Sequence, residues 1–212
     1  MAEDRWCTFD CYGTLIDWNG GIRAEFARVF GEDRADELLA RYHELEPELE
    51  ADGTRSYREV LTEAMRRLGA PSDEEDSLAR SLPGWQPFPE VPDALTEARE
   101  RGWKLAILSN TDRDFIDASQ ERIGVPFELA IVASEVGSYK PGLGHWQAFE
   151  REVGRLPDVH VAASLFHDIA PANQLGLRSI WVNRLGENAE PEPTCELPDL
   201  ARLPETLDEV AA

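Results

Sequence analysis

The stretch FDCYGTLID, residues 9–17, ends a short apolar run with a carboxylate and then turns sharply. The run RWCTFD, residues 5–10, is typical of a buried β-strand, and the Gly-Thr pair that follows is a turn signal. In an open parallel sheet, ligands bind outside the carboxyl ends of the strands. The stretch therefore predicts that Asp10 lies at the mouth of a binding site, with the aromatic ring of Tyr12 two residues away.

Further short apolar runs follow in the second half of the chain, and amphipathic stretches of helical length separate them. This alternation predicts an α/β fold in which helices wrap a parallel sheet. The tail, residues 186–210, is rich in proline and glutamate and is expected to close in a short helix. The four further predicted strands are residues 104–110, 129–134, 160–166 and 179–184.

Residues 11–103 separate the first predicted strand from the second, far more than one crossover connection needs. Apolar residues at three- and four-residue steps predict helices over most of this segment, and a proline-rich stretch leads back to the sheet. We therefore predict two domains. The core comprises residues 1–16 and 87–212, and residues 17–86 form an inserted helical cap.

The composition is strongly acidic. The chain of 212 residues has a net charge of −21, and its only lysines are Lys104 and Lys140. A surface this negative repels nucleic acid and anionic membranes.

The sequence has no apolar run of about 18 residues and begins with an acidic segment instead of a secretion signal, so we expect a cytoplasmic protein. Three cysteines without metal-type spacing argue against a disulfide framework or a zinc site.

Polar residues follow the later predicted strands as well. Ser109 and Asn110 end the second strand, Lys140 lies in the loop after the third, and His167 with Asp168 follows the fourth. Each of these residues, taken singly, also fits an ordinary role as a turn, loop or structural residue. In a chain with two lysines, however, the position of each one is informative. Together with the first carboxylate, these groups predict one cluster at the same edge of the sheet.

In this order, the motifs resemble those of the haloacid dehalogenase superfamily. Its four motifs are similar to FDCYGTLID, to LAILSNT with Ser109, to SYKPG with Lys140 and to SLFHDIAPANQLGL with Asp168. The resemblance covers nearly the whole chain and implies a Rossmann-like sheet with a helical cap. It also implies that Asp10 is a covalent nucleophile, oriented by Thr14 and backed by the Lys140 ammonium.

Two positions distinguish the branches of this superfamily. Its phosphatases carry a second acid where this chain has Tyr12, and a magnesium-binding acid where it has Ala163. The chain resembles the 2-haloacid dehalogenases instead. That resemblance implies that Asp10 displaces halide from C2 of a small 2-haloalkanoic acid and that water then hydrolyses the ester, with no metal and no cofactor.

The resemblance also implies a substrate site. Ser109 and neighbouring backbone N–H groups are expected to hold the substrate carboxylate, and Arg41 in the cap to lie near the departing halide. Trp146 stands where the well-known haloacid dehalogenases have a tyrosine. The expected substrate-binding residues are Tyr12, Arg41, Ser109, Asn110 and Trp146.

The residues that activate the hydrolytic water differ from those of the dehalogenases. Where those enzymes have serine and asparagine in the fourth motif, this chain has Ala163 and Leu165. His167, directly before Asp168, is the expected substitute as general base, with a purely structural histidine as the alternative.

Three other functions remain open on the sequence. The same nucleophile would serve another leaving group, as in the opening of a strained-ring amino acid. A magnesium-dependent phosphatase and a catalytically silent binding protein are the other two. The expected partner is a small carboxylic acid, without nucleic acid or membrane, and the sequence leaves open whether the chain forms a homodimer.

Overall fold

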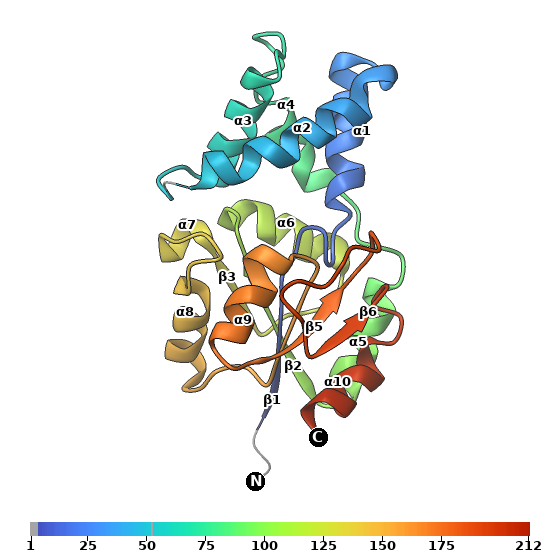
Figure 1. Cartoon of the computed structure of the whole chain (residues 1–212), viewed down its shortest axis with the longest axis vertical. Helices are drawn as coiled ribbons and strands as arrows, with labels where there is room; N and C mark the ends of the chain where they lie inside the picture. The colour runs from blue at the N-terminus through green and yellow to red at the C-terminus, as the bar shows by residue number, and fades with distance from the viewer. Residues whose placement is uncertain (1–3, 52) are drawn as a thin grey trace.

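A computed structural model describes residues 4–51 and 53–212 (Figure 1). Within these residues, one parallel sheet of six strands has the order β3-β2-β1-β4-β5-β6. Helices cover both of its faces, which confirms the predicted α/β fold. The strands are β1 (Arg5–Phe9), β2 (Trp103–Ser109), β3 (Leu129–Val132), β4 (Val159–Ala162), β5 (Arg178–Val182) and β6 (Cys195–Leu197).

Alternating side chains along the strands build the core on both faces of the sheet. Cys7 and Phe9 of β1 belong to the larger apolar cluster, which includes α5 (Val91–Glu100), α6 (Arg113–Ile123) and α10 (Leu203–Ala211). Trp6, on the opposite face, packs with α8 (Gly144–Val153) in a second cluster. Successive residues of a strand point to opposite faces, so a sheet buried on both sides requires near-continuous apolar strands.

The structure differs from the predicted strands in several places, and the fifth strand ends at Val182, two residues earlier than predicted. The third strand stops at Val132 because the chain turns into the short helix α7 (Ala133–Val136). The fourth strand ends at Ala162, and the residues after it form a π-helical turn, η2 (Leu165–Ile169), followed by α9 (Ala170–Gln174). The tail contributes the short strand β6, which pairs with β5, besides the expected closing helix.

Strand β1 occupies the position in the sheet that decides where ligands bind. It pairs with β2 on one side and with β4 on the other. The chain leaves β1 toward β2 and leaves β4 toward β5, so the connections from these two neighbouring strands run in opposite directions. Such a switch point leaves a crevice at the strand ends. Asp10 follows β1 directly, and its backbone N–H donates to the Val161 carbonyl at 3.0 Å.

A separate layer of helices lies over this edge of the sheet (Figure 1). The two chain segments that lead to and from it run side by side, since Asp17 N donates to Gln86 O at 2.9 Å and Phe88 N to Leu15 O at 3.0 Å. Both segments lie near the predicted domain boundaries. The helical layer consists of α1 (Trp18–Phe30), α2 (Glu32–Glu50), α3 (Tyr57–Arg67), α4 (Ser77–Ser81) and the 3₁₀ turn η1 (Leu82–Gly84).

A further contact fixes the helical layer to the core. The Asp112 carboxylate, in the loop after β2, accepts hydrogen bonds from Tyr57 N at 3.1 Å and Arg58 N at 3.0 Å, at the start of α3. A carboxylate is favourable there because it satisfies free N–H groups and faces the positive end of the helix dipole. In the described part of the chain, no helix is both long and apolar enough to cross a membrane.

Candidate active site

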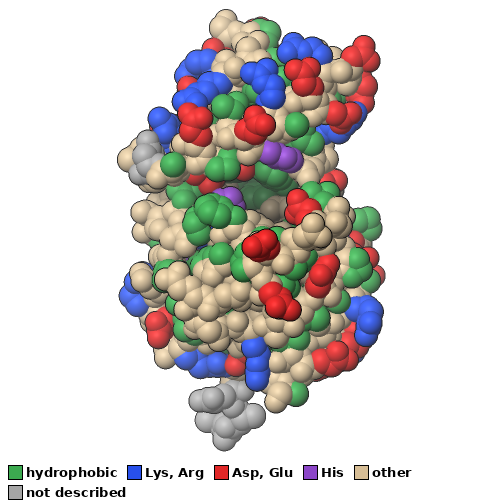
Figure 2. Space-filling view, viewed as in Figure 1, with side chains coloured by type: hydrophobic (Ala, Val, Ile, Leu, Met, Phe, Trp, Pro, Cys, Tyr) green, Lys and Arg blue, Asp and Glu red, His purple; other side chains and the backbone are tan. Residues whose placement is uncertain are grey.

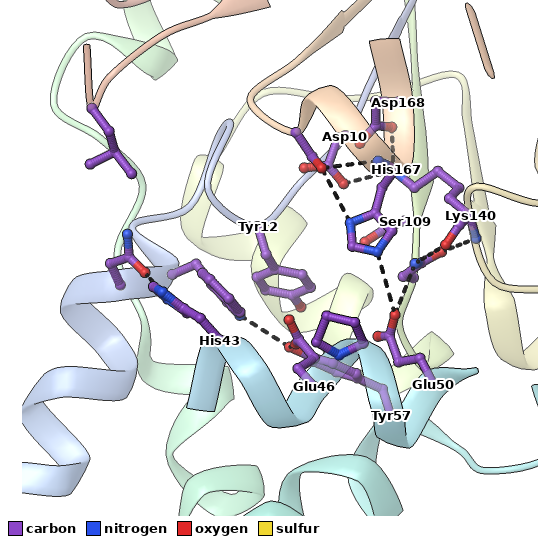
Figure 3. A pocket seen from close by; sticks show the side chains of 16 residues that line it. Asp10, Tyr12, His43, Glu46, Glu50, Tyr57, Ser109, Lys140, His167 and Asp168 are labelled. Carbon is purple, nitrogen blue, oxygen red and sulfur yellow. Dashed lines mark hydrogen bonds and ion pairs between the residues drawn. The ribbon is translucent and has the colours of Figure 1, made fainter. Parts of the chain in front are cut away.

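A buried lysine contacts two carboxylates at the carboxyl edge of the sheet (Figure 3). The Lys140 side chain is 1% exposed, and its Nζ donates to Asp10 Oδ1 at 2.8 Å, Asp168 Oδ1 at 2.6 Å and the Leu108 carbonyl at 2.8 Å. An ammonium has three protons, so these contacts use its whole donor capacity. Burial opposes the charged form, but the two carboxylates outweigh it and raise the pKa of Lys140. The group is therefore a permanent cation that bridges two acids.

Asp10 is oriented from both sides. Thr14 Oγ1 donates to its Oδ2 at 2.9 Å, and the same Thr14 oxygen accepts from Ala163 N at 2.9 Å. Burial raises the pKa of Asp10, while Lys140 and Thr14 act in the opposite direction. A carboxylate that is partly desolvated, fixed in orientation and held beside a cation is suited to act as a nucleophile.

Asp168 is held by a histidine that the sequence analysis did not select. His160 Nε2 lies 3.0 Å from Asp168 Oδ1, and its Nδ1 lies 2.8 Å from Thr8 Oγ1. Thr8 and His160 are register partners in β1 and β4 and form a polar pair inside a buried sheet. Burial raises the pKa of Asp168, but Lys140 and His160 outweigh it and hold that pKa well below its usual range. The carboxylate is thus ionised.

Asn110 fixes the loop that carries the lysine. Its Oδ1 accepts from Lys140 N at 2.7 Å, and its Nδ2 donates to Lys140 O at 3.0 Å. Its neighbour Ser109 is 1% exposed, and among the described residues its Oγ has no hydrogen-bond partner, although it lines the cavity. His145, also absent from the sequence prediction, holds the Ser109 carbonyl through Nε2 at 3.0 Å. The serine hydroxyl remains available to a bound molecule.

These groups face a cavity of about 280 Å³ between the strand ends and the helical layer. In the space-filling view a hollow separates the two parts of the molecule, with histidine and apolar side chains at its edges (Figure 2). Asp10, Ser109, Lys140 and Asp168 line it from the core. The helical layer contributes Trp18, His43, Glu46, Pro47, Glu50 and Tyr57.

The structure does not bring Arg41, expected near the departing halide, to the cavity. Arg41 is exposed on α2 and does not line the cavity. The face of α2 that lines the cavity carries His43, Glu46, Pro47 and Glu50, at three- and four-residue steps. Arg41 precedes His43 by two residues, which is a turn of about 200° around a helix, so it points away.

The structure does not bring Trp146, expected to bind substrate, to the cavity either. Trp146 is fully buried on α8, packs in the second apolar cluster and contacts His160 edge-on at a ring distance of 5.3 Å. Large apolar side chains on the buried face of a helix fill the core. Trp146 thus packs against His160 and does not line the cavity.

Tyr12 and His167 do line the cavity. The Tyr12 ring stacks on Tyr57 at a centroid distance of 6.2 Å, and its hydroxyl lies 3.0 Å from Ser119 Oγ, so it forms an aromatic wall. The His167 ring is held at Nδ1 by Ser164 Oγ at 3.2 Å. Burial lowers the pKa of His167, which keeps the ring neutral and able to accept a proton.

Two acids of α2 complete the site, and the sequence analysis missed both. Glu46 Oε1 accepts from the hydroxyls of Tyr42 and Tyr57, each at 2.8 Å. Glu50 Oε2 accepts from Asn110 Nδ2 at 3.4 Å and lies 3.9 Å from His167 Nε2. Burial raises the pKa of Glu46 to about 7 and that of Glu50 to about 9. Acids also cover the exposed face of α2, so no signal in the sequence singled out these two.

Residues 5–164 match the family model described as haloacid dehalogenase-like hydrolase, and the chain belongs to this family of hydrolytic enzymes. It is 29% identical to an (S)-2-haloacid dehalogenase of Pseudomonas sp. strain YL, over 96% of this chain and 94% of the relative. It is also 29% identical to a phosphoserine phosphatase of Thermus thermophilus, over 81% of this chain and 73% of that protein.

The fold is shared with a solved structure of an L-2-haloacid dehalogenase from Xanthobacter autotrophicus with chloropropionic acid covalently bound. The TM-score is 0.83 at 21% identity, and the alignment covers 97% of this chain and 99% of that one. The predicted membership of the superfamily is therefore confirmed, and the relatives include both carbon–halide hydrolases and phosphatases.

Replacing Lys140 tests the centre of the site. Lys140→Met keeps the side-chain length but leaves Asp10 and Asp168 facing each other without a cation. We expect turnover to fall on the order of 10²-fold or more, as for loss of a preorganised charge partner. Lys104→Met, which removes the only other lysine at the opposite end of β2, is the control and should keep activity. Near-normal turnover of Lys140→Met, with the fold verified by circular dichroism, contradicts the assignment.

Replacing Glu50 tests its protonation. Because the folded pKa of about 9 exceeds the ordinary 4.5, the folded chain holds a proton that the unfolded chain releases, and stability falls as pH rises between these values. Glu50→Gln removes this loss. At one pKa unit per about 1.4 kcal/mol, the variant should gain roughly 2 kcal/mol or more over wild type between pH 5 and pH 8 in urea unfolding.

The exposed Glu44 on the same helix supplies the control for that comparison. Glu44→Gln should track the wild type at both pH values. If Glu50→Gln shows no pH-dependent gain, Glu50 is ionised in the folded chain and the pKa assignment is wrong.

Proposed function

We propose that this hydrolase displaces halide from C2 of a small 2-haloalkanoic acid through an ester on Asp10. The observation that carries the proposal is the arrangement of Asp10, with Thr14 on one oxygen, Lys140 on the other and the cavity in front. The match to (S)-2-haloacid dehalogenases over nearly the whole chain supports it. Tyr12 lines the cavity at a position where a phosphatase of this superfamily needs an acid.

In the first step, an Asp10 oxygen attacks C2 from the side opposite the carbon–halogen bond. The carbon–oxygen bond forms as the halide leaves with the bonding electron pair, so no proton donor is needed. The Ser109 hydroxyl, unpartnered at the cavity wall, is placed to donate to the substrate carboxylate. Lys140 keeps Asp10 ionised and oriented until the ester forms.

In the second step, water attacks the carbonyl carbon of the Asp10 ester. A base takes the water proton, the ester bond breaks, and the 2-hydroxy acid leaves after its alkoxide is protonated. The neutral His167 ring is the proposed base, with Asp168 as the alternative. Lys140 lies beside the same carboxyl group and stabilises the negative charge that develops on its oxygen.

The donor set does not fit the magnesium ion of the superfamily's phosphatases. In residues 4–51 and 53–212, no three His, Cys, Asp or Glu side chains are grouped to hold a metal ion. Ala163, where those enzymes have an acid ligand, offers a methyl group, and its backbone N–H is used by Thr14. We therefore derive no step through a metal.

A second candidate keeps the Asp10 ester but changes the leaving group, as in the opening of a strained-ring amino acid. The observation in its favour is Glu50, whose raised pKa of about 9 leaves its carboxyl protonated at neutral pH beside the cavity. A leaving amine needs a proton donor, whereas a halide does not.

One screen separates the proposed reaction from the phosphatase alternative. Halide release is measured for 2-chloro- and 2-bromopropionate, with and without EDTA, beside phosphate release from an aryl phosphate with Mg²⁺. We expect EDTA-insensitive halide release, lost in Asp10→Asn and kept in the control Asp33→Asn, an exposed aspartate on α2. Magnesium-dependent phosphate release, or halide release that survives Asp10→Asn, contradicts the proposal.

A further inference from the structure

The charge balance of the cavity does not match a simple haloacid anion. Asp10, Glu46, Glu50 and Asp168 line it, and Lys140 is the only lysine or arginine in the described lining. The Lys140 ammonium already donates its three hydrogen bonds to Asp10, Asp168 and a backbone carbonyl. A substrate that brings only a carboxylate therefore finds no cation on the side of α2, where two acids stand.

The acids of α2 are built into the fold and are not mobile surface groups. Glu46 is 9% and Glu50 is 7% exposed. Glu46 is fixed by two phenol hydroxyls and Glu50 by the amide of Asn110. Uncompensated carboxyls in such places are unfavourable, because burial opposes their ionisation.

We propose that the substrate carries an ammonium group that binds between Glu46 and Glu50, at the end of the molecule remote from the carbon that Asp10 attacks. This inference rests on the proposed function, since it adds a recognition group to the same substrate. The substrate class is then a small zwitterionic acid with a cationic side chain.

Aromatic rings enclose the same part of the cavity. The Trp18 ring stacks on His43 at 5.1 Å with an interplanar angle of 9°, and Tyr12 stacks on Tyr57 at 6.2 Å. The faces of such rings attract cations, and tryptophan is the most effective of them. Trp18 also holds Tyr57 through Nε1 at 3.1 Å, which links the aromatic wall to Glu46.

Two unpartnered atoms show independently that the cavity is arranged for a polar ligand. The Ser109 hydroxyl and Asp168 Oδ2 have no hydrogen-bond partner in the described residues, although each residue is 1% exposed and lines the cavity. Buried polar atoms are nearly always paired, so these two call for a bound donor and acceptor. The carboxylate of a zwitterion supplies the acceptor for Ser109, and its cation faces the acids of α2.

Comparing how tightly two unreactive molecules bind tests the contribution of the positive charge on the ligand. The probes are 4-(trimethylammonio)butanoate and its neutral-tail isostere 5,5-dimethylhexanoate, which have the same shape and differ by one positive charge. Isothermal titration at pH 7.5 should give a dissociation constant at least about tenfold lower for the cationic probe, within the range of a desolvated cation–π and ionic contact. Equal or tighter binding of the isostere overturns the inference.

Variants then locate the recognition. A bound cation favours the ionised form of a neighbouring carboxyl, so Glu46→Gln and Glu50→Gln should each reduce the preference severalfold. Glu44→Gln, which replaces a carboxyl on the exposed face of α2, should leave it unchanged. If the preference survives both Glu46→Gln and Glu50→Gln, or falls equally in Glu44→Gln, it arises from the general acidity of the protein and the inference fails.

The brominated forms of the same pair keep this test separate from that of the proposed function. Bromide release from 2-bromo-4-(trimethylammonio)butanoate and from 2-bromo-5,5-dimethylhexanoate is compared as kcat/KM. A cation preference in binding without bromide release supports the recognition and contradicts the halide as leaving group. Equal bromide release from both compounds supports the proposed reaction and contradicts the cationic substrate.

Discussion

The bridge from one buried ammonium to two carboxylates is the interaction on which the site depends. Lys140 comes from a loop after β3, Asp10 from the end of β1 and Asp168 from the π-helical turn after β4, so the contact joins three separate parts of the sheet edge. Buried ions are unfavourable unless they are paired and hydrogen-bonded. Removing one partner leaves the remaining charges buried without compensation, which is strongly destabilising. The arrangement therefore fixes the orientation of the Asp10 carboxylate as well as its electrostatic surroundings.

The parallel sheet explains why part of the site could be predicted from the sequence. Asp10, Ser109 and Asp168 lie at or after the ends of neighbouring strands, so the sheet brings them to one edge. A motif that directly follows a buried strand can therefore be placed from the sequence. Arg41 could not be placed in the same way. The orientation of a cap helix depends on its packing, and one helical residue turns the side chain by about 100°, so a small error in alignment moves a residue to the other face.

The residues that were missed share a physical cause. His160 and His145 lie inside the sheet or beneath it and act through hydrogen bonds that only tertiary structure reveals. Glu46 and Glu50 belong to a helix whose exposed face is also acidic, so their charge carries no signal in a chain of this composition. Burial makes them distinctive, because it raises the pKa of both carboxyls.

The central claim is that Asp10 forms a covalent bond to the substrate, and a single turnover in H₂¹⁸O tests it most directly. Enzyme in excess is mixed with the 2-haloacid that is turned over fastest, and the peptide that contains Asp10 is examined by mass spectrometry together with the product. Attack of water on the ester carbonyl places the label in the Asp10 carboxyl group and leaves the product unlabelled. Label in the product hydroxyl, with none in Asp10, would mean that water attacks C2 directly and that Asp10 is not the nucleophile.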